Sequence, residues 1–205
     1  MDKSMRLEII RNFKARNIDV SFFETLEDVK NKIIELIHLD CSVGIGNSKT
    51  LKEINVSKIL KERGNIVFDK TLAASKEESK QMKKKSLLAD WYITGTNAVS
   101  KEGHLVNIDH SGNRVAAMMY GPDNVIVVVG KNKICNTLDD AINRARNISA
   151  PLNAKRAGYN PPCLKLEKCV DCKTDERVCF NLAIIEGQFV KDRMKLFIVN
   201  NELGF

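Results

Sequence analysis

The apolar residues in the first half of the chain alternate between helical and strand spacing. Leu7, Ile9, Ile10 and Phe13 recur on one helical face, and the "IDVSFF" that follows has the composition of a strand. The alternation continues as far as residue 94, and it predicts a mostly parallel sheet flanked by helices. The expected helices cover residues 4–17, 25–38, 48–60 and 75–90, and the expected strands cover 18–23, 41–46, 65–69 and 91–94.

The pattern changes in the second half. Three apolar segments, 104–109, 114–120 and 125–130, are separated by "HSGN" and "GPDN", which are strong turn signals. We expect the first two segments to pair as a β-hairpin, which adds an antiparallel section to the parallel sheet. The remaining elements are a helix at 138–149, opened by a capping pattern, and strands at 182–187 and 195–200. The sequence thus predicts one α/β domain over 1–205, with a cysteine-rich loop at 161–180.

Composition narrows the class of protein. With 43% hydrophobic and 29% charged residues, the chain has an ordinary globular profile. Its longest apolar run, "VIVVVG", is too short to cross a membrane, and the first residues lack a secretory signal, so a cytoplasmic protein without a membrane partner is expected. The net charge of +7 does not predict a nucleic-acid partner, because basic and acidic residues are mixed, as in 76–86.

The turn "VGIGNSKTLKEI" is the first candidate binding site. Glycines at a strand end, followed by hydroxyl side chains at a helix start, suit an anion held by free backbone N–H groups. The third glycine of a dinucleotide fingerprint and the ending of a P-loop are both missing. The alternative is a tight capped turn without a ligand. The candidate residues are Gly44, Gly46, Asn47, Ser48 and Thr50.

A second candidate site follows the strand at 91–94. If this strand and 41–46 are parallel neighbours, their following turns lie side by side at one sheet edge. Arg114 could then hold a carboxylate or phosphate with two parallel hydrogen bonds. The alternative is a set of ordinary turns with a salt bridge between Arg114 and Asp109. No catalytic dyad can be identified from the sequence. The candidate residues are Thr94, Gly95, Thr96, Asn97, Asn107, Asp109, Asn113 and Arg114.

Four cysteines lie within seventeen residues, spaced C-x5-C-x2-C-x6-C. In a reducing compartment such a cluster favours a metal site over disulfides, because thiolates converge on an ion that neutralises them. Nearby basic residues would offset the remaining negative charge. The spacing does not decide between zinc and a 4Fe–4S cluster, and free thiols are the alternative. The expected ligands are Cys163, Cys169, Cys172 and Cys179.

The segments "SVGIGNSKTLKEI", "TGTNAVSKEGHLVNIDHSGNRVAAMMYGPDNVIVVVGKNKI", "APLNAKR" and "C…CVDC…RVC" together resemble the LUD (lactate-utilisation) domain family. The resemblance implies a fold similar to the ribose-phosphate isomerase, glucosamine-phosphate deaminase and CoA-transferase superfamily. It also implies that the ligand site lies at Gly44, Gly46, Asn47 and Ser48, and by position at Thr94–Asn97. The catalytic glutamate pattern of CoA-transferases is absent.

Two functional hypotheses follow from this resemblance and from the candidate sites. In the first, the chain is an accessory or subunit in the oxidation of lactate to pyruvate, beside iron–sulfur partner proteins, with its cysteines holding a metal or cluster. In the second, it is an enzyme or sensor for a small anionic or phosphorylated metabolite, with a structural zinc. A homodimer is compatible with both.

Overall fold

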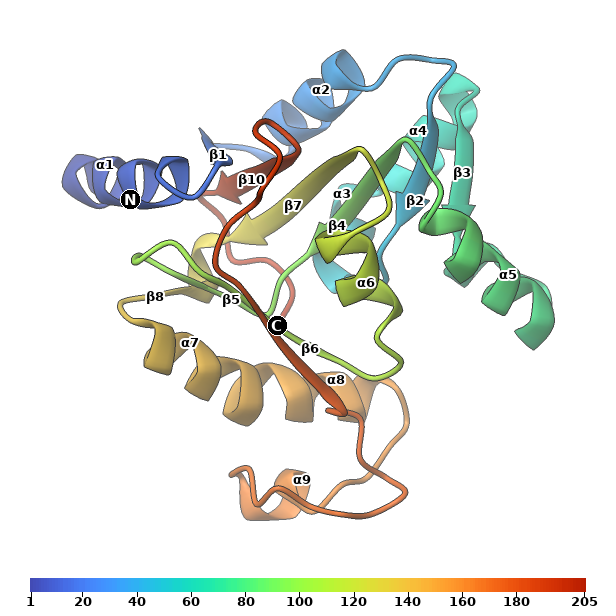
Figure 1. The fold of residues 1–205 in the computed structure, drawn as a ribbon. Helices are drawn as coiled ribbons and strands as arrows, with labels where there is room; N and C mark the ends of the chain where they lie inside the picture. Colours follow the sequence, from blue (N-terminus) through green and yellow to red (C-terminus); the bar gives the residue numbers. More distant parts are fainter.

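The computed structural model describes residues 1–205 and contains two β-sheets (Figure 1). In the larger sheet all six strands are parallel. This arrangement confirms the mostly parallel sheet that the alternating pattern predicts. In spatial order the strands are β1 (Ile18–Phe23), β10 (Met194–Val199), β7 (Asn124–Gly130), β4 (Trp91–Gly95), β2 (Ser42–Ile45) and β3 (Ile66–Asp69).

The smaller sheet has four strands and mixed pairing. β6 pairs antiparallel with both β5 and β9, and β5 pairs parallel with β8. An antiparallel section is therefore present, as expected, but it forms a separate sheet. In spatial order the strands are β8 (Ile134–Cys135), β5 (Ala98–Ser100), β6 (Leu105–Asp109) and β9 (Asn181–Ile185).

The central strand β7 shows why the larger sheet is buried on both faces. Val125, Val127 and Val129 pack into one hydrophobic core, and Ile126 and Val128 pack into another on the opposite face. Successive side chains of a strand point to opposite faces, so a strand covered on both sides must be apolar throughout. The uninterrupted apolar run in this part of the sequence is the consequence.

Helices cover both faces of the larger sheet (Figure 1). On one face lie α2 (Leu26–Leu36), α3 (Lys49–Ile54) and α4 (Val56–Arg63). The other face is covered by α1 (Lys3–Lys14), α6 (Asn113–Met119) and the smaller sheet.

The remaining helices pack against β3 and β2, against the smaller sheet, or against one another. α5 packs against β3 and β2, and α7 packs against the smaller sheet. No helix is long and apolar enough to cross a membrane. The helices and helical turns not yet named are η1 (Lys70–Leu72), α5 (Lys76–Ser86), η2 (Lys131–Lys133), α7 (Leu138–Arg144), the π-helical turn η3 (Ala145–Ser149), α8 (Ala150–Arg156) and α9 (Cys163–Leu166).

The prediction of a hairpin between 104–109 and 114–120 is wrong, because residues 114–119 form most of helix α6. The turn before this helix is fixed by Gly112 in a left-handed conformation, and Asp109 Oδ2 accepts hydrogen bonds from the backbone N–H groups of Arg114 and Val115. These bonds satisfy donors at the helix start that would otherwise be free. The strand β6 pairs instead with β5 and β9.

The helix expected over 48–60 is interrupted. Asn55 adopts a left-handed conformation with φ of 60°, which ends α3 and begins α4. Asparagine tolerates this conformation better than most residues. Two other helix starts are as expected: Thr25 with Asp28, and Thr137 with Asp140, both form reciprocal capping boxes.

Candidate functional site

A cavity of about 350 Å³ opens at the carboxyl ends of β2 and β4. These strands are parallel neighbours, with Gly44 opposite Tyr92 and Ile45 opposite Ile93. The turns that follow them therefore lie side by side, which is the arrangement that the sequence predicts. Parallel sheets bind ligands at this edge because strand ends and helix starts converge there. The predicted site residues that line the cavity are Asn47, Ser48, Gly95, Thr96, Asn97, Asp109, Asn113 and Arg114.

Five predicted residues lie outside the cavity wall, and the two glycines serve packing instead. A Cβ atom on Gly44 would come within 2.8 Å of Ser86 Cβ, and one on Gly46 would collide with Thr94. The glycines thus allow β2 to approach its neighbours, and they do not bring the backbone to a ligand in this cavity. The five residues are Gly44, Gly46, Thr50, Thr94 and Asn107.

Arg114 is held by the protein itself. Its Nη1 donates to Gly95 O and Asn107 Oδ1, both at 2.8 Å. Its Nη2 donates to Asn97 Oδ1 at 2.9 Å and to Ile108 O at 2.8 Å. Four of the five guanidinium N–H donors therefore bind neutral acceptors. The donors that were expected to hold an anion with two parallel hydrogen bonds point into the protein instead. Arg114 contributes positive charge to the cavity and ties the turns together.

The salt bridge between Arg114 and Asp109, which was the alternative to an anion site, is absent. Asp109 contacts the backbone N–H of Arg114 at 2.9 Å instead, and it also accepts from the N–H of His110 at 3.0 Å. The carboxylate thus fixes the turn from β6 into α6. It is the only acidic side chain in the cavity wall.

Positive charge dominates the cavity, and sequence reasoning missed most of it. None of its six cationic side chains forms an ion pair within 4 Å. Burial is the largest cause that lowers the pKa of Lys70, followed by the charge of Lys83. A lowered lysine pKa indicates that the charged form lacks compensation. The cationic residues are Lys49, Lys70, Lys83, Arg114, Lys133 and Arg156.

These cations come from separate parts of the chain, which explains why they were missed. The helix at 76–86 has the sequence of a solvated surface helix, yet Lys83 reaches the cavity from it. The one available signal was Lys133, which lies three residues after the end of the buried strand β7 and so at the same carboxyl edge as the predicted turns.

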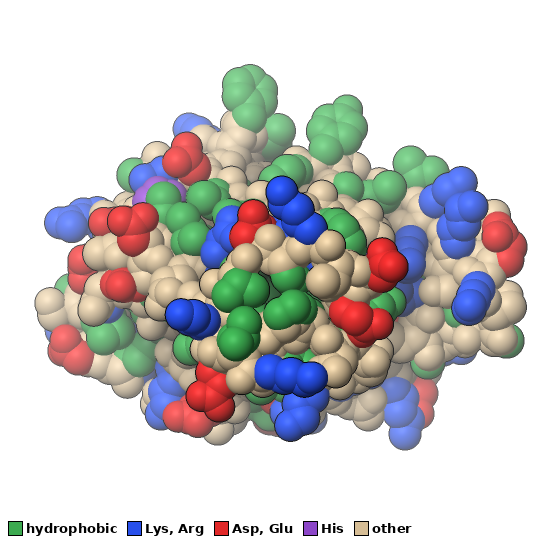
Figure 2. All heavy atoms as spheres, turned by 90° about the horizontal axis from the view of Figure 1, so that it is seen from below, with side chains coloured by type: hydrophobic (Ala, Val, Ile, Leu, Met, Phe, Trp, Pro, Cys, Tyr) green, Lys and Arg blue, Asp and Glu red, His purple; other side chains and the backbone are tan.

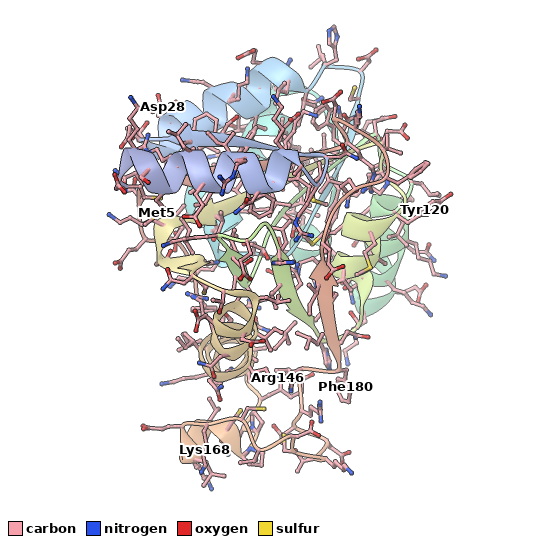
Figure 3. All side chains as sticks on the ribbon, turned by 60° about the vertical axis from the view of Figure 1, so that its left-hand side comes forward. Met5, Asp28, Tyr120, Arg146, Lys168 and Phe180 are labelled. Carbon is pink, nitrogen blue, oxygen red and sulfur yellow. The ribbon has the colours of Figure 1, made fainter.

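We define the cysteine segment as residues 157–180, between α8 and β9, and it forms one wall of the cavity. Tyr159 and Val178 line the cavity. The centroid of the His110 ring is 5.7 Å from that of Tyr159 and 5.5 Å from that of Phe180. In Figure 3 the segment lies below Arg146, with Lys168 toward its outer end. The predicted pocket and the cysteine loop are thus adjacent.

The four predicted cysteine ligands line one small cavity of about 20 Å³, together with Val178. All six cysteines of the chain are free thiols. Burial raises the pKa of the Cys163 and Cys179 thiols, and the nearby cysteines raise that of Cys163 further. No group of three or more His, Cys, Asp or Glu side chains is arranged to hold a metal ion. The metal site therefore stays a prediction.

Both charged and hydrophobic side chains surround the thiols. Arg177 donates to the backbone oxygens of Cys172 at 2.8 Å and Cys179 at 3.2 Å, and to Asp171 Oδ1 at 2.8 Å. It therefore supports the backbone of the segment. Figure 2 shows the face on the α9 side, where hydrophobic side chains, a class that includes cysteine there, gather at the centre among charged ones.

A serine–histidine contact occurs outside the cavity. Ser100 Oγ lies 2.8 Å from His104 Nδ1, across the turn between β5 and β6, and Ser100 is fully buried. Burial lowers the pKa of His104. A nucleophile must reach its substrate, so this pair closes the turn and is not a candidate dyad.

Comparisons with known proteins agree with the fold and identify a family. The family model described as "LUD domain" matches residues 7–199. A DUF162 family protein from Deinococcus radiodurans superposes with a TM-score of 0.57 and 14% identity, over 96% of this chain and 97% of its own. This likeness shows the fold alone. No curated protein matches the sequence.

A further solved structure is similar over part of the chain. Ribose 5-phosphate isomerase A from Methanocaldococcus jannaschii covers 56% of this chain and 57% of its own, with a TM-score of 0.37 and 19% identity. A likeness at that score carries no argument about activity.

Proposed function

Because the chain belongs to the LUD domain family, we propose that it acts in lactate utilisation by binding a small anionic metabolite in the cavity at the carboxyl ends of β2 and β4. The observation that carries the proposal is the charge balance of the side chains in the cavity wall, where six are cationic and one is acidic. An anion entering this cavity meets unpaired positive charge, and the low local dielectric strengthens the attraction.

The size of the cavity suits a small metabolite. Its volume of about 350 Å³ is at the lower end of the range for ligand pockets, and most of its wall is polar. Lys49 and Arg156 are exposed, and Lys70 and Lys83 are half-buried. The first two are placed to attract an anion from solvent, and the second two to hold it.

In this proposal the chain is an accessory or subunit in the oxidation of lactate to pyruvate. That oxidation releases two electrons, which iron–sulfur partner proteins would accept. A homodimer remains a prediction. The alternative ligand is a phosphorylated metabolite, which the same cations would bind, and the experiment below separates the two.

The test compares Lys83→Met with Lys80→Met, a change on the same helix outside the cavity. The probes are L-lactate, pyruvate and inorganic phosphate, with chloride at equal ionic strength as reference. We expect a carboxylate to raise the melting temperature of wild type and Lys80→Met. Lys83→Met should bind about tenfold more weakly, because a hydrogen bond to a charged group contributes about 1.5 kcal/mol.

Three outcomes contradict the proposal. If no probe raises the melting temperature, or if Lys83→Met responds like Lys80→Met, the cavity does not bind anions as described. A response to phosphate alone would overturn the lactate role in favour of a phosphorylated metabolite.

We also propose that the cysteine segment holds a metal, with zinc favoured over a 4Fe–4S cluster. The support is that four thiols line one cavity of about 20 Å³, which has room for a single ion-sized occupant. Zinc is commonly bound by four cysteines in structural sites, where it stabilises a fold that lacks a core. Cys163, Cys169, Cys172 and Cys179 would be its ligands.

A further inference from the structure

Lys133 is the most deeply buried cation in the cavity wall. It ends the turn η2, directly after β7, and only 4% of its surface is exposed. Its Nζ lies 3.4 Å from Thr50 Oγ1 and 3.3 Å from Thr96 O, both longer than an ordinary hydrogen bond of this kind. No carboxylate pairs with it. The amine is therefore weakly held and faces a cavity.

The charges around Lys133 favour the neutral amine. Burial is the largest cause that lowers its pKa, to about 7, and Arg144 and Arg114 lower it further, while Glu53 acts in the opposite direction. A lysine with an ordinary pKa is almost entirely protonated near neutral pH, so Lys133 has about a thousandfold larger neutral fraction. Only the neutral amine has a free electron pair for attack on carbon.

A glycine packs closely beside the amine. A Cβ atom on Gly204 would lie 3.2 Å from Lys133 Nζ and closer still to Thr50 Oγ1. The chain end that carries Gly204 thus packs against the amine without covering it with a side chain. Phe205, the next residue, lines the cavity.

We propose that Lys133 is a nucleophile that forms a Schiff base with an aldehyde or ketone carrying a carboxylate or phosphate group. This inference rests on the proposed anion binding, because the surrounding cations would hold the anionic group while the carbonyl carbon meets Nζ. The neutral amine attacks that carbon and a C–N bond forms. The carbonyl oxygen then leaves as water with the two amine protons, so the step needs no oxidant or reductant.

Lys70 is the other lysine of this cavity with a lowered pKa, and it makes a weaker candidate. It is half-buried and lies near Lys83. An amine on the accessible side of the cavity is suited to binding the anionic group. The two lysines thus have separable roles, which peptide mapping can distinguish.

The test is reductive trapping of the full-length protein. Pyruvate and glyceraldehyde 3-phosphate are incubated separately with the protein near neutral pH and sodium cyanoborohydride, and adducts are located by intact mass and peptide mapping. We expect one main adduct, at Lys133, formed at least tenfold faster than at any other lysine. Lys131→Met, on the same turn but outside the cavity, should retain it, and Lys133→Met should lose it.

If Lys133→Met does not fold, trapping experiments on the wild-type protein alone can still overturn the proposal. An absent adduct, or one spread evenly over surface lysines, would contradict it, as would an adduct that excess inorganic phosphate does not suppress. If anions raise the melting temperature but no adduct forms, the Schiff base falls while anion binding stands. If neither occurs, both proposals fall.

Discussion

The cavity at the carboxyl ends of β2 and β4, here called the anion cavity after its proposed ligand, is bordered by the cysteine segment. The protein holds the two regions in different ways. The cavity is built on the ends of buried parallel strands, and Arg114 ties its turns together with four hydrogen bonds. The cysteine segment contains one helix of four residues, α9, and no strand. Its four thiols make no hydrogen bonds, whereas Cys135 Sγ donates to Lys133 O.

This difference in structural support indicates which of the two sites is formed before a ligand binds. A cavity fixed by a strand ladder and a closed hydrogen-bond network has the same geometry with or without an anion. A segment without a core or ladder has little free energy of its own to fix four side chains. We therefore expect the cavity to be preformed, and the cysteine segment to gain its order from an occupant.

The largest expected effect is on the free energy of unfolding. Ile126→Ala removes a fully buried side chain of β7 and should cost about 2–5 kcal/mol. Leu166→Ala, in the cysteine segment, removes a side chain that is 53% exposed and should change stability by less than about 0.5 kcal/mol. Urea unfolding measures both, and equal costs would remove the distinction between the two regions.

The next effect concerns order in the cysteine segment. Zinc added to reduced, metal-free protein should slow trypsin cleavage after Lys165, Lys168, Lys173 or Arg177 by about tenfold, because a site opened by local unfolding is protected when a ligand binds the closed form. Cys172→Ser should lose the protection, and Cys41→Ser, outside the segment, should keep it.

Metal analysis of protein purified without oxygen completes this test. Colourless protein with stoichiometric zinc is the expected result, and brown protein would indicate a cluster instead. If zinc leaves the cleavage rate unchanged, or if Cys172→Ser responds as wild type does, the four-cysteine site is contradicted.

A further effect is a pH dependence that belongs to the cavity. The pKa of Lys133 is about 7 in the folded protein, against an ordinary value of 10.5, so between these values the unfolded chain binds more protons. Stability then rises with pH across this window, and the gain is absent below it. Urea unfolding at several pH values should show a smaller rise for Lys133→Met than for wild type and Lys131→Met. If stability rises equally with pH in all three proteins, the pKa of Lys133 is not lowered in the folded protein.

The parallel sheet could be predicted from the sequence because each of its strands is an independent local signal. The apolar run of β7 specifies a strand covered on both faces wherever it lies in the chain. The segment at 114–120 was mistaken for a strand because its short apolar run fits both periods. Its helix is favoured by Ala116, Ala117 and Met118, and by the capping of Asp109, whose side chain comes from the preceding strand.

The cavity could be predicted only in part, for the same reason. Asn47, Ser48 and Gly95–Asn97 lie at or just after the ends of strands that pair, so their proximity follows from the topology. Lys83 and Arg156 arrive from helices whose orientation depends on packing across the whole fold. A net charge counted along the chain does not reveal that cations converge at one point.

Val178 lies in the wall of both the anion cavity and the small cavity lined by cysteines, and it is 5% exposed. If an occupant of one cavity shifts this side chain, the affinity for an occupant of the other changes as well. Thermodynamic reciprocity then requires the same factor in both directions. A thiol-bound ion that tightens anion binding tenfold would itself be bound tenfold more tightly in the presence of the anion, which makes this shared valine the point where the two sites would act as one cooperative unit.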